Sequence, residues 1–301
     1  MKLIYHQGNN FGDALNPIIF NHYIPDLLTN KADENLLGIG SIIGLKSNLK
    51  GRKIVFSSGY AANQVETYGQ LPKLNEDWDI FCVRGPLTAK ALQINESLAI
   101  SDGAILLPKV IPPPTQNPKS YTFGFMPHHK SIEMFNEWAT ICKNLNIIFI
   151  DPSQNPFIVL KEILSVKVLL TEAMHGAIIA DAYRIPWVPI KLYPYINEFK
   201  WFDWAKSLEI ENLVFHSFSS TLHDITFLKK VFNNKTKNLI PSFVTNISVN
   251  QILSFRKKKF TKELKNILKT HHPLLSCEST LKDKQNLLIE RFTDLKMKYG
   301  H

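Results

Sequence analysis

Short apolar runs bounded by turn residues alternate with longer amphipathic stretches through the first two thirds of this 301-residue chain. Strand-length runs separated by helix-length stretches are typical of βα units, because two parallel strands need a crossover helix between them. We therefore expect an α/β protein with parallel sheets. The expected strands are 2–6, 36–39, 53–57, 79–83, 98–100, 121–126, 147–151, 167–171, 186–190 and 213–216, and the expected helices between them are 13–23, 86–93, 131–143, 157–164 and 175–184.

One proline-rich segment divides this pattern. Residues 110–118 read VIPPPTQNP and contain four prolines in nine residues, which excludes a helix interior or a central strand. We expect an N-terminal Rossmann-like domain at 1–111, a linker at 112–118 and a C-terminal Rossmann-like domain at 119–219, facing each other across a cleft. A helical basic tail should follow at 220–301 and pack on one or both domains, with helices at 220–232, 249–269 and 279–298.

Positive charge is concentrated in the last third of the chain. Residues 1–200 hold 18 Lys and Arg against 17 Asp and Glu, whereas residues 201–301 hold 17 against 9. The densest run is Arg256–Lys259, followed at helical spacing by Lys262, Lys265 and Lys269. Such a run can meet nucleic acid, an anionic membrane surface or only water. The chain lacks the interleaved basic and aromatic pattern of nucleic-acid readers, so no nucleic-acid partner is expected.

The apolar runs, the first residues and the cysteines limit where the protein can be located and whether it can bind a metal. No apolar run reaches the roughly 18 residues that a membrane-spanning helix needs, and the first residues lack the apolar core of a signal peptide. We expect a cytoplasmic protein, with peripheral attachment to the inner face of the cytoplasmic membrane as an alternative. Cys82, Cys142 and Cys277 have no metal-ligand spacing, so we expect neither a metal nor a cofactor.

Three motifs of the first domain follow expected strands. QGNNFGDALNP opens a helix with Asn10, Gly12, Asp13 and Asn16, and it fits either an anion site or a helix capped by Asp13. Arg84 in VRGPLT can present its planar fork to a carboxylate or phosphate, or form a surface salt bridge. In the segment SDGA, residue 102 is an aspartate that can cap a helix or orient the arginine or a substrate hydroxyl.

Two motifs of the second domain also follow strands. MPHHKS places His128, His129 and Lys130 at a helix start, as an anion cradle in which at most one of the adjacent histidines should face the cleft. TEAMHGAIIADA places His175 at the start of a helix. A bound phosphate or Glu172 would favour its charged form, which suits a general acid. A structural histidine is the alternative.

In this order and spacing, NNFGDALNP, VRGPLTAKAL, SDGAILLP, FMPHHKS and TEAMHGAIIADAYRIPWVPI resemble the polysaccharide pyruvyltransferase family, in particular its succinoglycan-type exopolysaccharide branch. The resemblance extends from residue 1 to about 209. It implies a fold like that of the two-domain GT-B glycosyltransferases. It also implies transfer of the enolpyruvyl group of phosphoenolpyruvate onto two hydroxyls of a sugar, which forms a cyclic ketal and releases phosphate.

The resemblance assigns the site. The family's catalytic histidine corresponds to His175 and its donor-binding arginine to Arg84, whereas the arginine that many relatives carry two residues before the histidine is Ala173 here. The positive charge that this arginine supplies in the relatives should come here from Lys130, Lys191, Lys200 or His128. The expected catalytic residues are His175 and Asp13; the expected phosphoenolpyruvate contacts are Arg84, His128, His129, Lys130, Gly176 and Gly12; the expected acceptor or supporting residues are Asn10, Asn16, Asp102, Glu172, Lys191, Lys200 and Trp201.

The implied partners are phosphoenolpyruvate and a saccharide or lipid-linked oligosaccharide. Two alternatives remain at this point. One is a GT-B enzyme that uses a nucleotide sugar, because a fold does not fix the donor. The other is an inactive polysaccharide-binding homologue, which the substitution at Ala173 makes conceivable.

Overall fold

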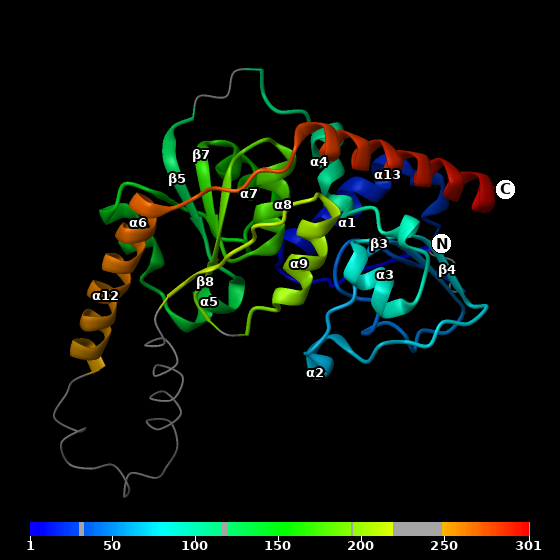
Figure 1. The fold of residues 1–301 in the computed structure, drawn as a ribbon, viewed down its shortest axis with the longest axis horizontal. Coiled ribbons are helices and arrows are strands. Elements are labelled where there is room, and N and C mark those ends of the chain that lie inside the picture. Colours follow the sequence, from blue (N-terminus) through cyan, green and yellow to red (C-terminus); the bar gives the residue numbers. More distant parts are fainter. Residues whose placement is uncertain (30–32, 116–118, 194, 219–248, 301) are drawn as a thin grey trace, which may run out of the picture.

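The computed structural model describes residues 1–29, 33–115, 119–193, 195–218 and 249–300, and it contains two parallel sheets (Figure 1). The first has the order β1-β2-β3-β4 and the second the order β6-β5-β7-β8-β9. The α/β fold with parallel sheets is therefore confirmed. The strands of the first sheet are β1 (Lys2–Ile4), β2 (Glu34–Leu37), β3 (Arg52–Ser58) and β4 (Trp78–Val83); those of the second are β5 (Tyr121–Met126), β6 (Ile148–Phe149), β7 (Val166–Thr171), β8 (Trp187–Lys191) and β9 (His216–Ser217).

The helices between the strands cover both faces of the sheets, which is why the inner strands are continuous apolar runs. In β3, for example, Ile54, Val55 and Phe56 are all fully buried. The longer connecting helices are α1 (Phe11–Tyr23), α3 (Pro86–Leu92), α7 (Pro156–Leu164), α8 (Met174–Ala182) and α9 (Glu198–Ser207), and the shorter elements are η1 (Pro25–Leu27), α2 (Val65–Tyr68), η2 (Glu96–Leu98), η3 (Gly103–Leu106) and α4 (Leu107–Val110).

Three predicted elements differ in the structure. The strand expected at 98–100 is wrong: Asn95 caps the 3-10 turn η2, and only Ala99 then bridges to Val83. The strand expected at 213–216 shrinks to β9. The helix expected at 131–143 is split into α5 (His129–Met134) and α6 (Trp138–Asn144), because Phe135 takes an extended conformation and turns into the core against Trp138.

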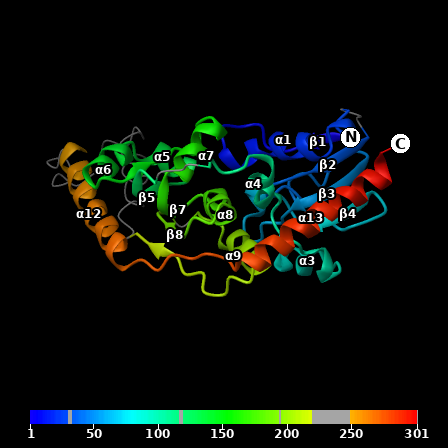
Figure 2. The same ribbon diagram turned by 90° about the horizontal axis from the view of Figure 1, so that it is seen from above.

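The last helices pack on the two sheets in turn (Figure 2). On the second sheet, α12 (Val249–Thr270) buries Phe260, Leu264 and Ile267. Residue Leu274 then forms an antiparallel bridge to Trp187, and α13 (Glu278–Tyr299) returns to the first sheet, where the Phe292 ring lies 4.0 Å from that of Phe56. Residues 112–115 are exposed and have no regular structure, and the helix expected at 220–232 lies outside the described residues.

A buried ion pair joins α9 to the first sheet. Arg84, which follows β4, donates from Nε to Asp203 Oδ2 at 2.9 Å, and both side chains are fully buried. Asp203 also accepts from the backbone N–H and the hydroxyl of Thr88 at the start of α3. A Cβ atom on Gly85 would lie 2.0 Å from the Asp203 carbonyl oxygen, so this close approach requires glycine.

The substitution Asp203→Ala should lower the free energy of unfolding by about 3–5 kcal/mol, because it leaves the Arg84 charge buried without its partner. Urea unfolding followed by circular dichroism measures this change. The matched control is Glu278→Ala, which breaks the exposed Lys282–Glu278 pair and should change stability little. Equal effects of the two substitutions would contradict a structural role for the buried pair.

Candidate functional site

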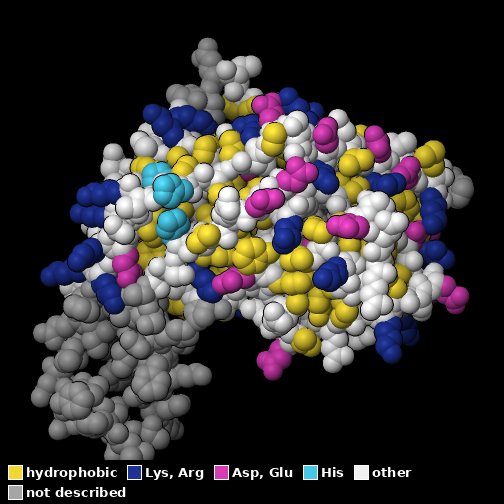
Figure 3. Space-filling model, in the orientation of Figure 1, with side chains coloured by type: hydrophobic (Ala, Val, Ile, Leu, Met, Phe, Trp, Pro, Cys, Tyr) yellow, Lys and Arg dark blue, Asp and Glu magenta, His cyan; other side chains and the backbone are white. Residues whose placement is uncertain are grey.

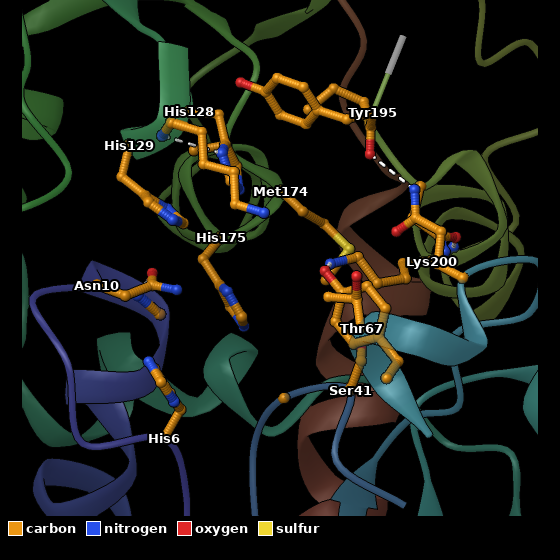
Figure 4. A pocket seen from close by; sticks show the side chains of 18 of the residues that line it. His6, Asn10, Ser41, Thr67, His128, His129, Met174, His175, Tyr195 and Lys200 are labelled. Atoms are coloured by element: carbon orange, nitrogen blue, oxygen red, sulfur yellow. Dashed lines mark hydrogen bonds between the residues drawn. The ribbon is translucent and has the colours of Figure 1, made fainter. Parts of the chain in front are cut away.

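A cavity of about 840 Å³ lies where the strands of both sheets end. His6 follows β1 and Ser41 follows β2, while His128, Glu172 and Tyr195 follow β5, β7 and β8. Ligands of parallel sheets bind at the carboxyl ends of the strands, so the position is the one expected for a binding site. Figure 4 shows the labelled side chains converging on this space from both sheets.

His175 is the second residue of α8 and lies on the wall of the cavity. Its Nε2 atom lies 3.7 Å from Oδ2 of the fully buried Asp102, and neither atom has a hydrogen-bond partner. The Nδ1 atom lies over Gly12, where an added Cβ would come within 1.9 Å of it. Asp102 also caps η3 through Oδ1. The predicted histidine, glycine and aspartate therefore meet in space.

The start of α1 forms the wall beside His175. Asn10, rather than Asp13, caps this helix and accepts from the Gly12 N–H at 3.1 Å. That leaves the Asp13 carboxylate free to border the cavity, where burial raises its pKa against the opposing effect of His175, His6 and Lys200. Asn16 has a different place: it is fully buried and bonds the backbone of Ile39, so it holds α1 to the loop after β2.

His128 and His129 both line the cavity, which corrects the expectation that only one would. Their ring centroids lie 4.1 Å apart. Burial, with the nearby His129, Lys200 and Lys130, lowers the pKa of His128 to about 2, and burial also lowers the pKa of His129. His128 is therefore neutral at physiological pH when no anion is bound, whereas Lys130 and Lys200 carry a positive charge on the same wall.

Glu172 does not face His175, contrary to the sequence-based expectation. It is buried and accepts from the backbone N–H groups of His128, Leu192 and Tyr193 and from the Ser131 hydroxyl. Burial raises its pKa to about 7, and these hydrogen bonds oppose the shift. The carboxyl group thus ties together the ends of β5, β7 and β8. The carboxylate that faces His175 is Asp102.

The cations expected to bind phosphoenolpyruvate occupy different places. Lys130 and Lys200 line the cavity, and the Lys200 ammonium donates to the Tyr68 hydroxyl at 2.9 Å. Lys191 does not line it and pairs with Glu198 instead. Arg84 is also absent from the wall, because its donors are used by Asp203, by Ser41 at 2.7 Å and by the Tyr60 carbonyl. The guanidinium therefore supports the wall from behind Ser41.

Two further residues expected in the site, Gly176 and Trp201, have structural roles in packing. A Cβ atom on Gly176 would lie 2.6 Å from Thr171 Oγ1 and 2.7 Å from Met126 Sδ, so this glycine lets α8 approach β7. Trp201 is only 1% exposed, although it borders the cavity, and its ring packs against those of Phe215 and Trp187. Gly176 does not line the cavity, and the Trp201 ring is held by its packing.

Several residues of the wall were not predicted. His6 follows β1 and could have been found from that position alone, whereas Tyr68 lies in a helix of four residues with no periodic pattern. Two hydrogen bonds connect loops of the two sheets here: Gln64 donates to the Tyr195 carbonyl and Asn197 to the Ala62 carbonyl. Within the described part of the chain, no cluster of three or more His, Cys, Asp or Glu has the geometry of a metal site.

The comparisons with known proteins agree with the motifs. A family model described as polysaccharide pyruvyl transferase matches residues 8–192. The succinoglycan biosynthesis protein ExoV of Rhizobium meliloti (strain 1021) is 34% identical over 208 residues, which make up 68% of this chain and 63% of that relative. The match thus spans less than two thirds of the relative's length, and no solved structure matches the chain. Because the family model covers more than half of the sequence, the chain belongs to the polysaccharide pyruvyl transferase family.

Proposed function

We propose that this protein transfers the enolpyruvyl group of phosphoenolpyruvate to two hydroxyls of a sugar in an exopolysaccharide or its precursor. The product is a cyclic pyruvate ketal, and phosphate is released. The observation that carries the proposal is the pair formed by His175 and the buried Asp102 on the wall of a cavity that Lys130 and Lys200 also line. The pair supplies an acid, and the cavity supplies positive charge for an anionic donor.

His175 would protonate the methylene carbon of the donor. A histidine suits this step because its ordinary pKa lies near neutral pH, so it can both hold and release a proton. Asp102 faces Nε2 at 3.7 Å and would stabilise the charged ring while Nδ1, over Gly12, exchanges the proton. Protonation leaves C2 of the donor electron-poor, with oxocarbenium character. A sugar hydroxyl then adds to C2.

The other groups of the cavity would hold the donor. Lys130 has no carboxylate within ion-pair distance among the described residues, so its ammonium group can bind the donor's phosphate or carboxylate. His129 and His6 border the same space and can donate hydrogen bonds. These donors would also stabilise the charge on the departing phosphate. Asp13, next to His175, is the candidate for activating one of the two acceptor hydroxyls.

The two sheets would correspond to two Rossmann-like domains in a GT-B-like arrangement, with boundaries at 1–111 and 119–219. Support comes from the separate strand orders of the two sheets and from a cavity that both border. The return of α13 to the first sheet, after α12 has packed on the second, would fasten the two domains together.

The acceptor would be a growing saccharide or a lipid-linked oligosaccharide at the inner face of the cytoplasmic membrane. Among the described residues, no helix is long and apolar enough to span a bilayer. Lys258, Lys262, Lys265 and Lys269 are exposed at a spacing that places them on one face of α12. Lys and Arg side chains also gather at the left edge of Figure 3, where α12 lies in Figure 1. This face would attract anionic lipid.

The substitution His175→Ala should reduce phosphate release from phosphoenolpyruvate by at least about 100-fold, because the reaction loses its acid. The assay uses purified protein with β-galactoside, glucoside and N-acetylhexosamine acceptors. His22→Ala, an exposed histidine at the end of α1, is the matched control and should keep the activity.

Thermal shift distinguishes the alternatives. Stabilisation by phosphoenolpyruvate supports the proposed donor, whereas stabilisation by a nucleotide sugar alone would refute it and favour a glycosyltransferase. Donor binding without acceptor-dependent phosphate release from the full panel and from lipid-linked saccharide extracts would favour an inactive homologue.

Replacing Lys258, Lys262, Lys265 and Lys269 by Gln should abolish sedimentation with phosphatidylglycerol vesicles at low salt. Each cation near such a surface contributes about 1 kcal/mol of binding free energy. The control carries the same charge change on α13, at Lys282, Lys284, Lys296 and Lys298. Loss of binding in both variants would indicate a general charge effect, and binding that high salt does not weaken would refute this surface. The side chain of Arg256, predicted as part of the same run, lies outside the described residues.

A further inference from the structure

Tyr68 and Lys200 form a pair on the wall of the cavity, and the proposed binding of the donor gives Tyr68 no role. Tyr68 ends α2, and Lys200 lies in the first turn of α9. The Lys200 ammonium donates to the Tyr68 hydroxyl at 2.9 Å and lies 4.6 Å from the centre of its ring. Both residues line the cavity. The contact therefore places a phenol oxygen, held by a cation, on the wall of the cavity.

Lys200 has no carboxylate within 4.0 Å in the described part of the chain, and its ammonium group donates to the Tyr68 hydroxyl. Burial alone would raise the pKa of Tyr68, yet this pKa lies below its usual value. The groups responsible come from three elements: Lys200 on α9, Lys130 on α5 and Arg84 after β4. The buried carboxyl of Asp13 also lies within electrostatic reach of Lys200.

The other tyrosine of the cavity wall provides a contrast. Burial and the nearby Glu172 raise the pKa of Tyr195, and its hydroxyl is hydrogen-bonded to Ser131. Its phenol therefore stays protonated. Of these two tyrosines, Tyr68 is the one whose surroundings favour the phenolate, the form that can accept a proton.

Ketal formation needs a proton acceptor besides His175 and Asp13. Each of the two sugar hydroxyls loses a proton, while the donor's C3 gains one, and a histidine that has just donated to C3 becomes a base only after the transfer. Figure 4 shows Lys200 and Thr67, the residue before Tyr68, across the cavity from His175 and His6. An acid and a base on opposite sides of C2 suit addition across the double bond.

On the basis of the proposed function, we propose that Tyr68, held by Lys200, is the base that takes the proton from an acceptor hydroxyl as it attacks C2. The hydroxyl O–H bond breaks, the O–C2 bond forms, and the proton moves to the Tyr68 oxygen. When the second hydroxyl closes the ketal, its O–H bond breaks and its proton passes to Asp13. Its O–C2 bond forms, the C2–O bond to phosphate breaks, and phosphate leaves with the electron pair. The proton on Tyr68 then passes to phosphate or to solvent, which restores the phenolate.

The first measurement is the titration of tyrosines by near-ultraviolet difference absorbance. Tyr68→Phe should remove one phenol whose pKa lies below the ordinary tyrosine range. Lys200→Met should raise the pKa of that phenol by about one unit or more. Tyr121→Phe, at the exposed start of β5, is the matched control and should leave it in place. The proposal is overturned if the same low titration persists in Tyr68→Phe.

The second measurement is the pH dependence of kcat for acceptor-dependent phosphate release. Tyr68→Phe should lower kcat by about 100-fold or more, with unchanged affinity for phosphoenolpyruvate in calorimetry. Because the base must be deprotonated, the rate rises with pH through its pKa, so Lys200→Met should shift this limb to higher pH and Lys200→Arg should restore it.

The outcomes separate the two proposals. Wild-type turnover together with an unchanged kcat and pH profile in Tyr68→Phe would overturn the role of Tyr68 alone. A wild-type protein that binds phosphoenolpyruvate but turns over no acceptor, or that does not bind it, overturns the proposed function and the role of Tyr68 with it.

Discussion

The buried Arg84–Asp203 pair supports much of the cavity. Removing two charges from water is costly, and this pair is tolerated because its remaining donors and acceptors are satisfied by Thr88, Ser41 and the Tyr60 carbonyl. Ser41 borders the cavity, and Asp203 lies on α9, the helix that carries Lys200. The position of the Lys200 ammonium opposite Tyr68 therefore depends on an ion pair that lies outside the cavity itself.

Burial shifts the pKa of four ionisable groups near the site, Asp13, His128, His129 and Glu172. Glu172 and Asp13 both have raised pKa values because they are buried, whereas the neutral His128 accepts the Lys130 N–H at its helix start. Glu172 and His128, which hold the loops in place, thus accept hydrogen bonds from backbone N–H groups. The groups assigned to the chemistry, His175 and Asp102, keep atoms without a hydrogen-bond partner. Glu172 and His128 differ in this respect from His175 and Asp102.

Local patterns predicted the strands and the helix starts well, because alternation and turn residues act over a few positions. They placed His175 at the start of α8 and allowed Asp102 to cap a helix, as it does for η3, although the strand expected before it at 98–100 is absent. They could not show that Arg84 would form an ion pair with Asp203, 119 positions along the chain. Nor could they show that Tyr68 would accept a hydrogen bond from Lys200, 132 positions away. Such partners are set by the packing of α9 on α3, and short elements such as α2 leave no periodic signal.

Ala173 shows how the separation of acid and base can arise. It occupies the N-cap of α8 without a capping side chain, so no cation stands beside His175 on its own helix. The two lysines that line the cavity come instead from α5 and α9. A cation next to a phenol favours the phenolate. The positions of Lys200 and Lys130 therefore favour the deprotonated form of Tyr68, which its proposed step requires.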